Sequence, residues 1–164
     1  MDFHAFLEYV PKIMEATLPA KKAHYKLAPL YRIADMERLE LQSINPKTAA
    51  VMMLFYPKNN MTHLVLIVRN SYEGVHSAQI AFPGGKFESE DQTYEITALR
   101  ETFEEIGIHP DSIEILRQFT RLYIPPSDFL VFPFLGICKK EISFILDASE
   151  VAAVIELPLA VFFR

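Results

Sequence analysis

The chain has 164 residues, which is enough for one domain with a hydrophobic core and too few for two domains of ordinary size. It is 51% hydrophobic and 23% charged, a composition typical of a globular protein. The net charge of -5 provides no excess of lysine and arginine to neutralise phosphates, which excludes a nucleic acid as the main partner.

Cysteine and histidine usage excludes the common zinc sites. Cys138 is the single cysteine, and the five histidines show no paired ligand spacing. The N-terminus lacks the basic start and apolar run of a signal peptide, and no apolar run reaches membrane-spanning length. We therefore expect a cytoplasmic protein with no membrane partner.

The first part of the chain predicts a helix followed by a hairpin. Apolar residues at helical spacing predict an amphipathic helix over residues 3–17. The charge-rich stretch over residues 21–47 is expected to wrap around the domain. Buried strands are predicted over residues 49–56 and 63–69, with a turn at residues 57–60 that would join them in a hairpin.

The rest of the chain predicts a second helix between strands. Residues 79–82 lead into a turn at Pro83-Gly84-Gly85, and a helix is expected from about Gln92 to Ile106. Asp91 is its candidate N-cap and Gly107 its C-terminal stop. Further strand-like elements are expected at residues 113–122, 129–138, 142–145 and 151–157. Strands on both sides of a central helix predict an α/β or α+β sandwich, in a single domain over residues 1–164 with an N-terminal helical region over 1–20.

The second helix carries a cluster of three glutamates. Its apolar stripe, expected to pack on the sheet, consists of Ile96, Leu99, Phe103 and Ile106. Glu101, Glu104 and Glu105 are expected together on the opposite side, since offsets of three and four residues share one face of a helix. A solvated acidic face is one interpretation of these glutamates, and a metal site is the other.

Two neighbours of the cluster favour the metal site. Arg100 can orient a glutamate or partly offset the negative charge. The glycines of Phe82-Pro83-Gly84-Gly85 allow backbone groups to approach a ligand closely, because no side chain obstructs them. Carboxylate and carbonyl oxygens suit Mg²⁺ or Mn²⁺, which bring a diphosphate along as a further ligand.

The segment from Gly85 to Ile108 resembles the signature of the Nudix hydrolase family. That signature reads G, five residues, E, seven residues, then R-E-U-x-E-E-x-G-U, where U is aliphatic. The matching positions are Gly85, Arg100, Glu101, Glu104, Glu105, Gly107 and Ile108. Asp91 stands in place of the first glutamate, with one extra residue before Arg100, and Thr102 replaces an aliphatic residue. The resemblance implies the Nudix fold, an α/β/α sandwich with a mixed sheet and a central signature helix.

The extra residue in the signature resembles the coenzyme A diphosphatase branch of this family. Residues 66–85 are similar to the segment that precedes the signature in that branch, with Arg69, His76, Gln79 and Phe82 to Gly85 as its members. Residues 128–134 and 149–159 are also similar, so the resemblance covers roughly residues 45–162. The chain departs from the branch at Gly74, where an arginine is usual, and at Ala78, where a glycine is usual.

The resemblance implies a metal-dependent site on the signature helix. Glu101, Glu104 and Glu105, with the Gly84 carbonyl, would hold Mg²⁺ or Mn²⁺, which orient a diphosphate and activate water for attack on phosphorus. Arg100 would hold the glutamates in place. Glu150 is the candidate general base, with a solvated loop residue as the alternative. Asp91 and Glu88 would act as outer helpers, or as caps and surface residues.

The expected substrate contacts are Arg69, His76, Gln79, Phe82, Gly85 and Lys86. Arg69 and Lys86 flank the glycines, where they could reach phosphate oxygens or serve as ordinary surface charge. Phe82 and Phe129 could line a nucleoside pocket or pack in the core.

The implied reaction is hydrolysis of coenzyme A or an acyl-coenzyme A to 3′,5′-ADP and 4′-phosphopantetheine. Two alternatives stay open. One is a Nudix hydrolase of ADP-ribose or another nucleoside diphosphate derivative, and the other is a Nudix-like regulatory domain that binds a nucleotide without cleaving it. The chain stops soon after Pro158-Leu159, where family members usually continue, so a truncated C-terminus is one interpretation. The apolar residues 160–163 and the N-terminal helix are compatible with a homodimer.

Overall fold

A computed structural model of the chain describes residues 1–27, 33, 45–70 and 79–163. Its sheet is mixed and has β1 (Lys47–Lys58) at the centre, parallel to β7 (Phe129–Ile137) and antiparallel to β2 (Met61–Arg69). The other strands pair antiparallel with these three: β3 (Ile80–Ala81) and β8 (Val151–Pro158) with β2, β4 (Gly84–Lys86) with β1, and β5 (Glu114–Gln118) and β6 (Leu122–Ile124) with β7.

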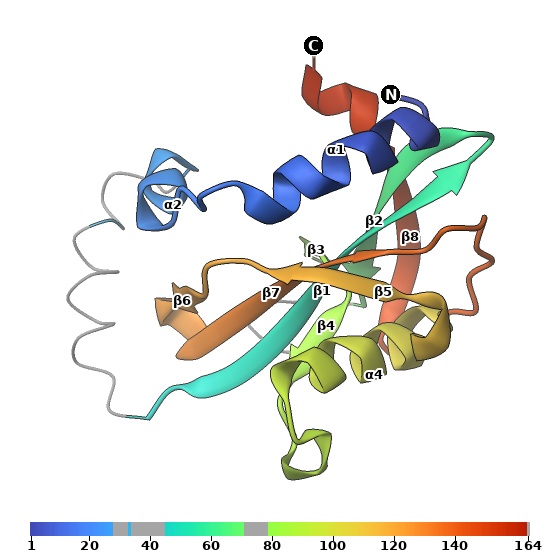
Figure 1. Cartoon of the computed structure of the whole chain (residues 1–164). Coiled ribbons are helices and arrows are strands. Elements are labelled where there is room, and N and C mark those ends of the chain that lie inside the picture. The colour runs from blue at the N-terminus through green and yellow to red at the C-terminus, as the bar shows by residue number, and fades with distance from the viewer. Residues whose placement is uncertain (28–32, 34–44, 71–78, 164) are drawn as a thin grey trace.

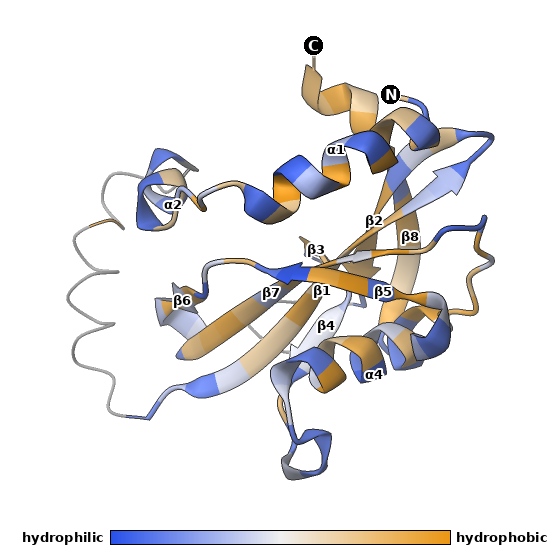
Figure 2. Ribbon diagram, viewed as in Figure 1, coloured by the Kyte–Doolittle hydropathy of each residue, from blue (hydrophilic) through white to orange (hydrophobic). Residues whose placement is uncertain are grey.

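Helices cover both faces of the sheet (Figure 1). Alternate side chains of β1 point to opposite faces, so Met52 and Leu54 pack toward α4 (Tyr94–Ile106) while Phe55 packs toward α1 (Phe3–Glu15). The predicted α/β/α sandwich with a mixed sheet is therefore confirmed. Figure 2 shows apolar residues concentrated in the central strands and alternating with polar residues along α1 and α4.

The N-terminal helix and the hairpin are confirmed. Asp2 caps α1 through its side chain, which accepts a hydrogen bond of 2.9 Å from the Ala5 amide. β1 and β2 pair around Asn59 and Asn60, which both have positive φ angles, 49° and 60°. Asparagine tolerates this left-handed region better than most residues, which suits it to a tight hairpin turn. A further helix, α2 (Lys21–Leu27), lies in the stretch for which no element was predicted.

Two predicted strands differ from the structure. The run predicted over residues 113–122 divides into β5 and β6, and residues 119–121 between them are not strand. The segment over residues 142–145 joins no strand, and its backbone bonds to the end of α4 instead. The Ile145 amide donates to the Ile106 carbonyl at 3.0 Å and so satisfies one of the carbonyls left open where the helix ends.

The predicted orientation of α4 is correct in part, since Ile106 is buried and Leu99 packs against the core, whereas Ile96 and Phe103 do not. Its buried residues are Thr97, Ala98, Thr102, Glu105 and Ile106, whereas Ile96 and Phe103 are 41% and 47% exposed. Ala98 and Thr102 are small, and both are fully buried, so this face lies close to β1 and β4. Glu105 therefore lies on the sheet side of the helix, and not on the opposite side as expected.

The start of α4 also differs from the prediction, whereas its end agrees with it. Thr93 is the N-cap, since its Oγ1 accepts a hydrogen bond of 3.2 Å from the Ile96 amide. Asp91 lies earlier, in a single 3₁₀ turn over Ser89–Asp91. Gly107 ends the helix with a φ of 75°, as expected of a glycine at this position. Among the residues that the structure describes, no helix has both the length and the apolar character needed to span a bilayer.

Candidate functional site

Gly84 and Gly85 form the floor of the site. The predicted turn at these residues is in fact the start of β4, which pairs antiparallel with β1. Gly84 has a φ of 151°, and a Cβ atom there would lie 2.3 Å from the Ala50 carbonyl oxygen. The ladder bonds flanking it run from the Met52 amide to Pro83 and from the Phe87 amide to Thr48. Alternate residues of an antiparallel strand make such bonds, so both backbone polar groups of Gly84 point away from β1.

Glu105 fills the space that this geometry opens beside Gly84. Its carboxylate is 1% exposed, and Oε2 accepts a hydrogen bond of 2.8 Å from the Gly84 amide. Oε1 accepts a bond of 3.0 Å from Arg69 Nη1, at the end of β2. Burial, together with the charges of Glu101 and Glu150, raises the pKa of Glu105 to about 7, although the Gly84 amide and Arg69 act in the opposite direction.

Glu101 lies one helical turn before Glu105 and packs against Gly85. A Cβ atom on Gly85 would lie 2.4 Å from the Glu101 carboxylate, so only glycine allows this approach. The Glu101 side chain is 13% exposed, and burial raises its pKa. Two partly desolvated carboxylates thus lie side by side over the two glycines.

Arg100 binds three carboxylates around the site. Its Nε and Nη2 donate to the two oxygens of Asp91 at 2.7 Å and 2.9 Å, and Nη1 donates to Glu101 at 2.9 Å and Glu104 at 2.8 Å. Nη2 also reaches the Lys86 carbonyl at 3.0 Å. A guanidinium suits this arrangement because its planar donors can bind several oxygens at once.

Asp91 serves as the anchor for Arg100. The Thr97 hydroxyl and the Glu88 amide donate to Asp91 Oδ2 at 2.8 Å and 2.9 Å. The hydrogen-bonded guanidinium of Arg100 holds the pKa of Asp91 well below its usual range. Asp91, where this chain departs from the family signature, is therefore held in a defined position behind the glutamates by its hydrogen bonds.

The donor set fits a hard divalent cation. Glu101 and Glu104 each use one oxygen for Arg100, and the other oxygen accepts no hydrogen bond from the residues described. Gly84 contributes a carbonyl that receives a long bond of 3.5 Å from Arg69. Residues 1–27, 33, 45–70 and 79–163 contain no preformed group of three ligating side chains around one point. A cation would nevertheless offset the charge that buried, neighbouring carboxylates concentrate here.

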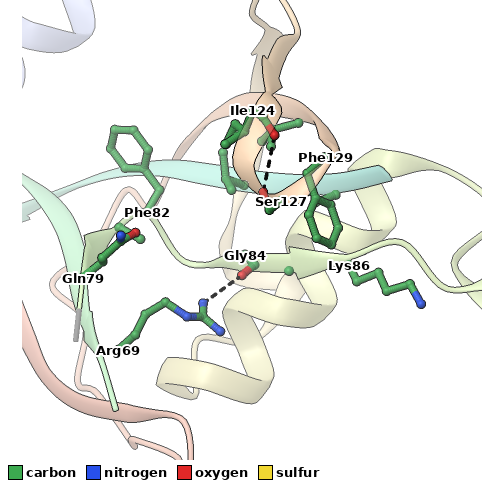
Figure 3. Close-up of a pocket in the computed structure, with 13 residues that line it drawn as sticks. Arg69, Gln79, Phe82, Gly84, Lys86, Ile124, Ser127 and Phe129 are labelled. Carbon is green, nitrogen blue, oxygen red and sulfur yellow. Dashed lines mark hydrogen bonds between the residues drawn. The ribbon is translucent and has the colours of Figure 1, made fainter. Parts of the chain in front are cut away.

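A pocket of about 330 Å³ opens beside the glycines (Figure 3). Five of the six predicted substrate contacts line it: Arg69, Gln79, Phe82, Gly85 and Lys86. Phe129, for which a pocket position and a core position were both considered, also lines it, with Gly84 at its floor. The sixth predicted contact, His76, lies outside the described residues.

Several pocket residues were missed by sequence reasoning. Val51 and Val131 come from β1 and β7, Ile124 ends β6, and Ser127 lies in the turn between β6 and β7. Alternation along β1 places Ala49 and Val51 on one face of the sheet, so the sequence pattern could have predicted that they share the pocket. The contribution of Ile124 and Ser127 depends on the pairing of β6 with β7, which no local pattern of this sequence specifies.

Glu150 lies directly before β8, near the end of β2. Its carbonyl accepts a hydrogen bond of 2.8 Å from the Asn70 amide, and its side chain is exposed. Its charge acts on both Glu101 and Glu105 and raises the pKa of each. The predicted general base therefore lies close enough to the predicted metal-binding glutamates for their charges to interact, although they come from different elements.

A model of the NUDIX domain matches residues 46–161 of the chain. The uncharacterized Nudix hydrolase NudL of Enterobacter sp. (strain 638) is 36% identical over 121 residues, which cover 71% of this chain and 60% of that protein. Nudix hydrolase 15, mitochondrial, of Arabidopsis thaliana is 33% identical over 141 residues, covering 84% of this chain and 47% of that protein. The chain thus spans 60% or less of the length of these relatives.

Solved structures share the fold. The Nudix domain of Shewanella oneidensis NrtR, complexed with ADP ribose, has a TM-score of 0.59 at 16% identity and covers 84% of this chain and 87% of that one. The binary complex of the C. elegans Ap4A hydrolase has a TM-score of 0.57 at 16% identity, covering 71% of this chain and 83% of that one. Together with the domain match over most of its length, these similarities show that the chain belongs to the Nudix domain family.

Proposed function

We propose that the chain is a metal-dependent diphosphatase that hydrolyses coenzyme A or an acyl-coenzyme A. The observation that carries this proposal is the meeting of Glu101 and Glu105 with Gly84 and Gly85 at the edge of a pocket. Carboxylates, a backbone carbonyl and an arginine are the groups that a diphosphate and its counter-cations require. An acidic surface helix with no such role would have no need for two glycines beneath its glutamates.

Glu101, Glu104, Glu105 and the Gly84 carbonyl would hold Mg²⁺ or Mn²⁺. When bound, the metal neutralises the diphosphate and lowers the pKa of a water molecule that attacks phosphorus. Arg100 fixes the directions of Glu101 and Glu104 through Asp91, and so acts as a positioning residue.

Arg69 and Glu150 would contribute from outside the helix. Arg69 points into the space beside Gly84, where its guanidinium can bind a phosphate oxygen of the substrate. Glu150 is exposed and its charge acts on Glu101 and Glu105, which supports the proposal that its carboxylate would accept the proton of the attacking water.

The coenzyme A assignment rests on the segment that precedes the signature in the sequence and on the residues that line the pocket. Arg69, Gln79, Phe82 and Gly85 belong to the branch-like segment, and all four line one cavity. Its apolar walls, which include Phe82 and Phe129, suit a nucleoside next to the diphosphate. This chain has Gly74 where the coenzyme A branch usually has an arginine, so ADP-ribose is the second candidate substrate. ADP ribose is the ligand in the NrtR structure.

The test is incubation of the protein with coenzyme A or ADP-ribose in Mg²⁺ or Mn²⁺, followed by identification of the products by mass. We expect 3′,5′-ADP and 4′-phosphopantetheine from coenzyme A, with no product from the Glu105→Gln variant. Glu95→Gln is the matched control, because Glu95 is an exposed glutamate in the first turn of the same helix. Cleavage of ADP-ribose alone would support the proposed mechanism and reject coenzyme A as the substrate. Cleavage of neither compound would favour a domain that binds a nucleotide without hydrolysing it.

A further inference from the structure

The pocket has a second basic region that the diphosphate chemistry does not use. Lys86 follows the two glycines on β4, and in Figure 3 it lies on the opposite side of Gly84 from Arg69. Lys47 begins β1, and its Nζ lies 5.7 Å from the centre of the Phe129 ring. Phe129 therefore has a lysine ammonium over its ring and a second lysine beside it in the pocket wall.

The strand register brings the two lysines together. Lys86 is directly opposite Ala49 in the β1–β4 pair, and Lys47 is two residues earlier on β1. Lys47 and Lys86 are therefore diagonal neighbours on one face of the sheet, about 7–8 Å apart at their Cα atoms. Lys47 is also the direct partner of Phe129 in the β1–β7 pair. All three side chains thus belong to the pocket face of the sheet.

Neither lysine is engaged by an ion pair with a residue that the structure describes. Asp128, which directly precedes β7, accepts a hydrogen bond of 2.7 Å from the Tyr123 hydroxyl. Glu101, Glu104 and Glu105 of α4 are bound instead by Arg100 and Arg69. Two ammonium groups next to an aromatic ring form a site for a dianionic phosphate attached to a planar base.

Lys47 lies too far from the metal site to bind the same phosphates as Gly84. Val51 is opposite Gly84 in the β1–β4 pair, and Lys47 is four residues from Val51, about 13 Å along an extended strand. A diphosphate held at Gly84 does not span that distance. A phosphate that contacts Lys47 therefore belongs to a substituent farther along the substrate, and Lys86, two residues from Gly84 on β4, lies on the way to it.

We propose that Lys47 and Lys86 bind a phosphomonoester on the nucleoside part of the substrate, while Phe129 stacks on the nucleobase. The proposal rests on the diphosphatase function above and narrows its substrate class to nucleoside diphosphate derivatives with a third phosphate on the ribose. Coenzyme A belongs to this class, and ADP-ribose does not. The two lysines would thus determine specificity without contacting the scissile bond.

The test compares coenzyme A with dephospho-coenzyme A, which lacks only the ribose phosphate. The wild-type protein should prefer coenzyme A, and Lys47→Gln and Lys86→Gln should each lower kcat/KM for coenzyme A by roughly three- to tenfold. The same variants should lower kcat/KM for dephospho-coenzyme A by a clearly smaller factor, and added salt should reduce the preference for coenzyme A. Lys139→Gln, at an exposed lysine paired with Glu114, is the control and should change neither substrate. Equal losses for both substrates would overturn the proposal, since the lysines would then contact the diphosphate.

Calorimetric binding of 3′,5′-ADP and of 5′-AMP in Mg²⁺ provides a readout that does not depend on hydrolysis. We expect tighter binding of 3′,5′-ADP, lost in the Lys47→Gln/Lys86→Gln double variant. If this preference is found in a protein that cleaves neither substrate, the phosphate subsite stands and the diphosphatase function fails. Equal affinity for the two nucleotides would reject the subsite whether or not the protein is an enzyme.

Discussion

A buried carboxylate controls the pH dependence of this protein at the scale of single residues. Glu105 has a pKa of about 7 in the folded protein, against an ordinary value of 4.5, because burial disfavours its charged form. The folded protein therefore holds this proton more tightly than the unfolded chain does. The stabilisation is fully present below about pH 4.5 and is lost as the pH rises through 7.

The first prediction concerns stability without metal. In a chelator, the free energy of unfolding should fall by roughly 3 kcal/mol between pH 4.5 and pH 8 through Glu105 alone. Urea unfolding at a series of pH values measures this slope, and Glu105→Gln should flatten it. Mg²⁺ should reduce the loss at high pH, because the metal binds the charged carboxylate. A slope that is unchanged in Glu105→Gln would show that other groups cause it.

The second prediction concerns Arg100. Its removal in Arg100→Ala leaves Asp91, which is 3% exposed, without its charged partner. We expect a loss of about 3 kcal/mol in the free energy of unfolding, since an unpaired buried charge is costly. Lys139→Ala, which breaks an exposed ion pair, should cost less than about 1 kcal/mol. Restoration of much of the loss in the Arg100→Ala/Asp91→Asn double variant would identify the unpaired carboxylate as the cause.

At the scale of elements, the close approach of α4 to β4 creates the site. Small residues on the helix and glycines on the strand make this approach possible from both sides. Ala98 and Thr102 are fully buried, and the Thr102 hydroxyl is satisfied within the helix by the Ala98 carbonyl at 2.6 Å. Gly85 leaves room for the Glu101 carboxylate. Any bulk added at this contact would move the carboxylates away from the glycine carbonyl.

The third prediction separates the roles of the two glycines. Gly85→Ala should preserve the fold, because its Cβ meets only the flexible end of Glu101, but it should weaken Mn²⁺ binding and lower activity by at least about tenfold. Gly84→Ala should instead destabilise the fold by more than about 2 kcal/mol, because its Cβ meets backbone atoms of Ala50 and Val51. Thermal unfolding and Mn²⁺ titration of both variants provide the measurement. Equal stability of the two variants would contradict this account.

The fourth prediction tests which face of α4 is buried. Ala98→Leu should cost about 1–3 kcal/mol, because the added atoms have no space between helix and sheet. Phe103→Ser, at a residue that is 47% exposed, should have a much smaller effect on the free energy of unfolding. Urea unfolding of both variants measures these effects. A larger loss in Phe103→Ser than in Ala98→Leu would show that the apolar stripe expected from the sequence is the buried face.

These elements show what the sequence could and could not predict. The strands β1 and β2 were predictable because their apolar runs are long and the Asn59-Asn60 turn lies between them. The face of α4 was not predictable, because Ile96 and Phe103 suggest burial by their hydrophobicity, while the buried positions are held by Ala98 and Thr102. The face that is buried is determined by the space that Gly84 and Gly85 leave on the sheet. The local periodicity of the helix contains no information about that space.

Some site residues could also be predicted from the sequence, and others could not. The glutamates and Gly84 were predictable from the signature resemblance, but the anchoring of Arg100 by Asp91 was not. That contact joins the 3₁₀ turn before α4 to the second turn of the helix, across a Gln92 residue with a φ of 62°. The backbone reversal brings Asp91 back over the helix, although a linear pattern would assign it the role of N-cap.

At the scale of the whole molecule, α1 closes the face of the sheet opposite α4. Phe3 and Phe6 pack on Phe55 and Ile137. Arg117 on β5 donates to the carbonyls of Ile13 and Ala16 at 2.6 Å and 2.7 Å, which satisfies the end of the helix. The two helices thus stabilise one sheet from separate clusters, and Glu101, Glu104 and Glu105 belong to the α4 side.

The fifth prediction follows from this separation. Phe6→Ala should lower the free energy of unfolding by about 3–5 kcal/mol, because Phe6 is 3% exposed in the cluster beneath α1. Mn²⁺ affinity and kcat/KM should stay within about twofold of the wild type at temperatures where the variant is folded. A selective loss of Mn²⁺ affinity in the folded variant would show that the two faces are coupled.

The most direct measurement for the whole account is Mn²⁺ binding followed by electron paramagnetic resonance, on wild-type, Glu101→Gln, Glu105→Gln and Glu95→Gln proteins. We predict that wild type and Glu95→Gln bind Mn²⁺ equally, whereas Glu101→Gln and Glu105→Gln bind it at least about tenfold more weakly. Equal binding by all four folded proteins would contradict the claim that the glutamates of α4 form a metal site over Gly84 and Gly85.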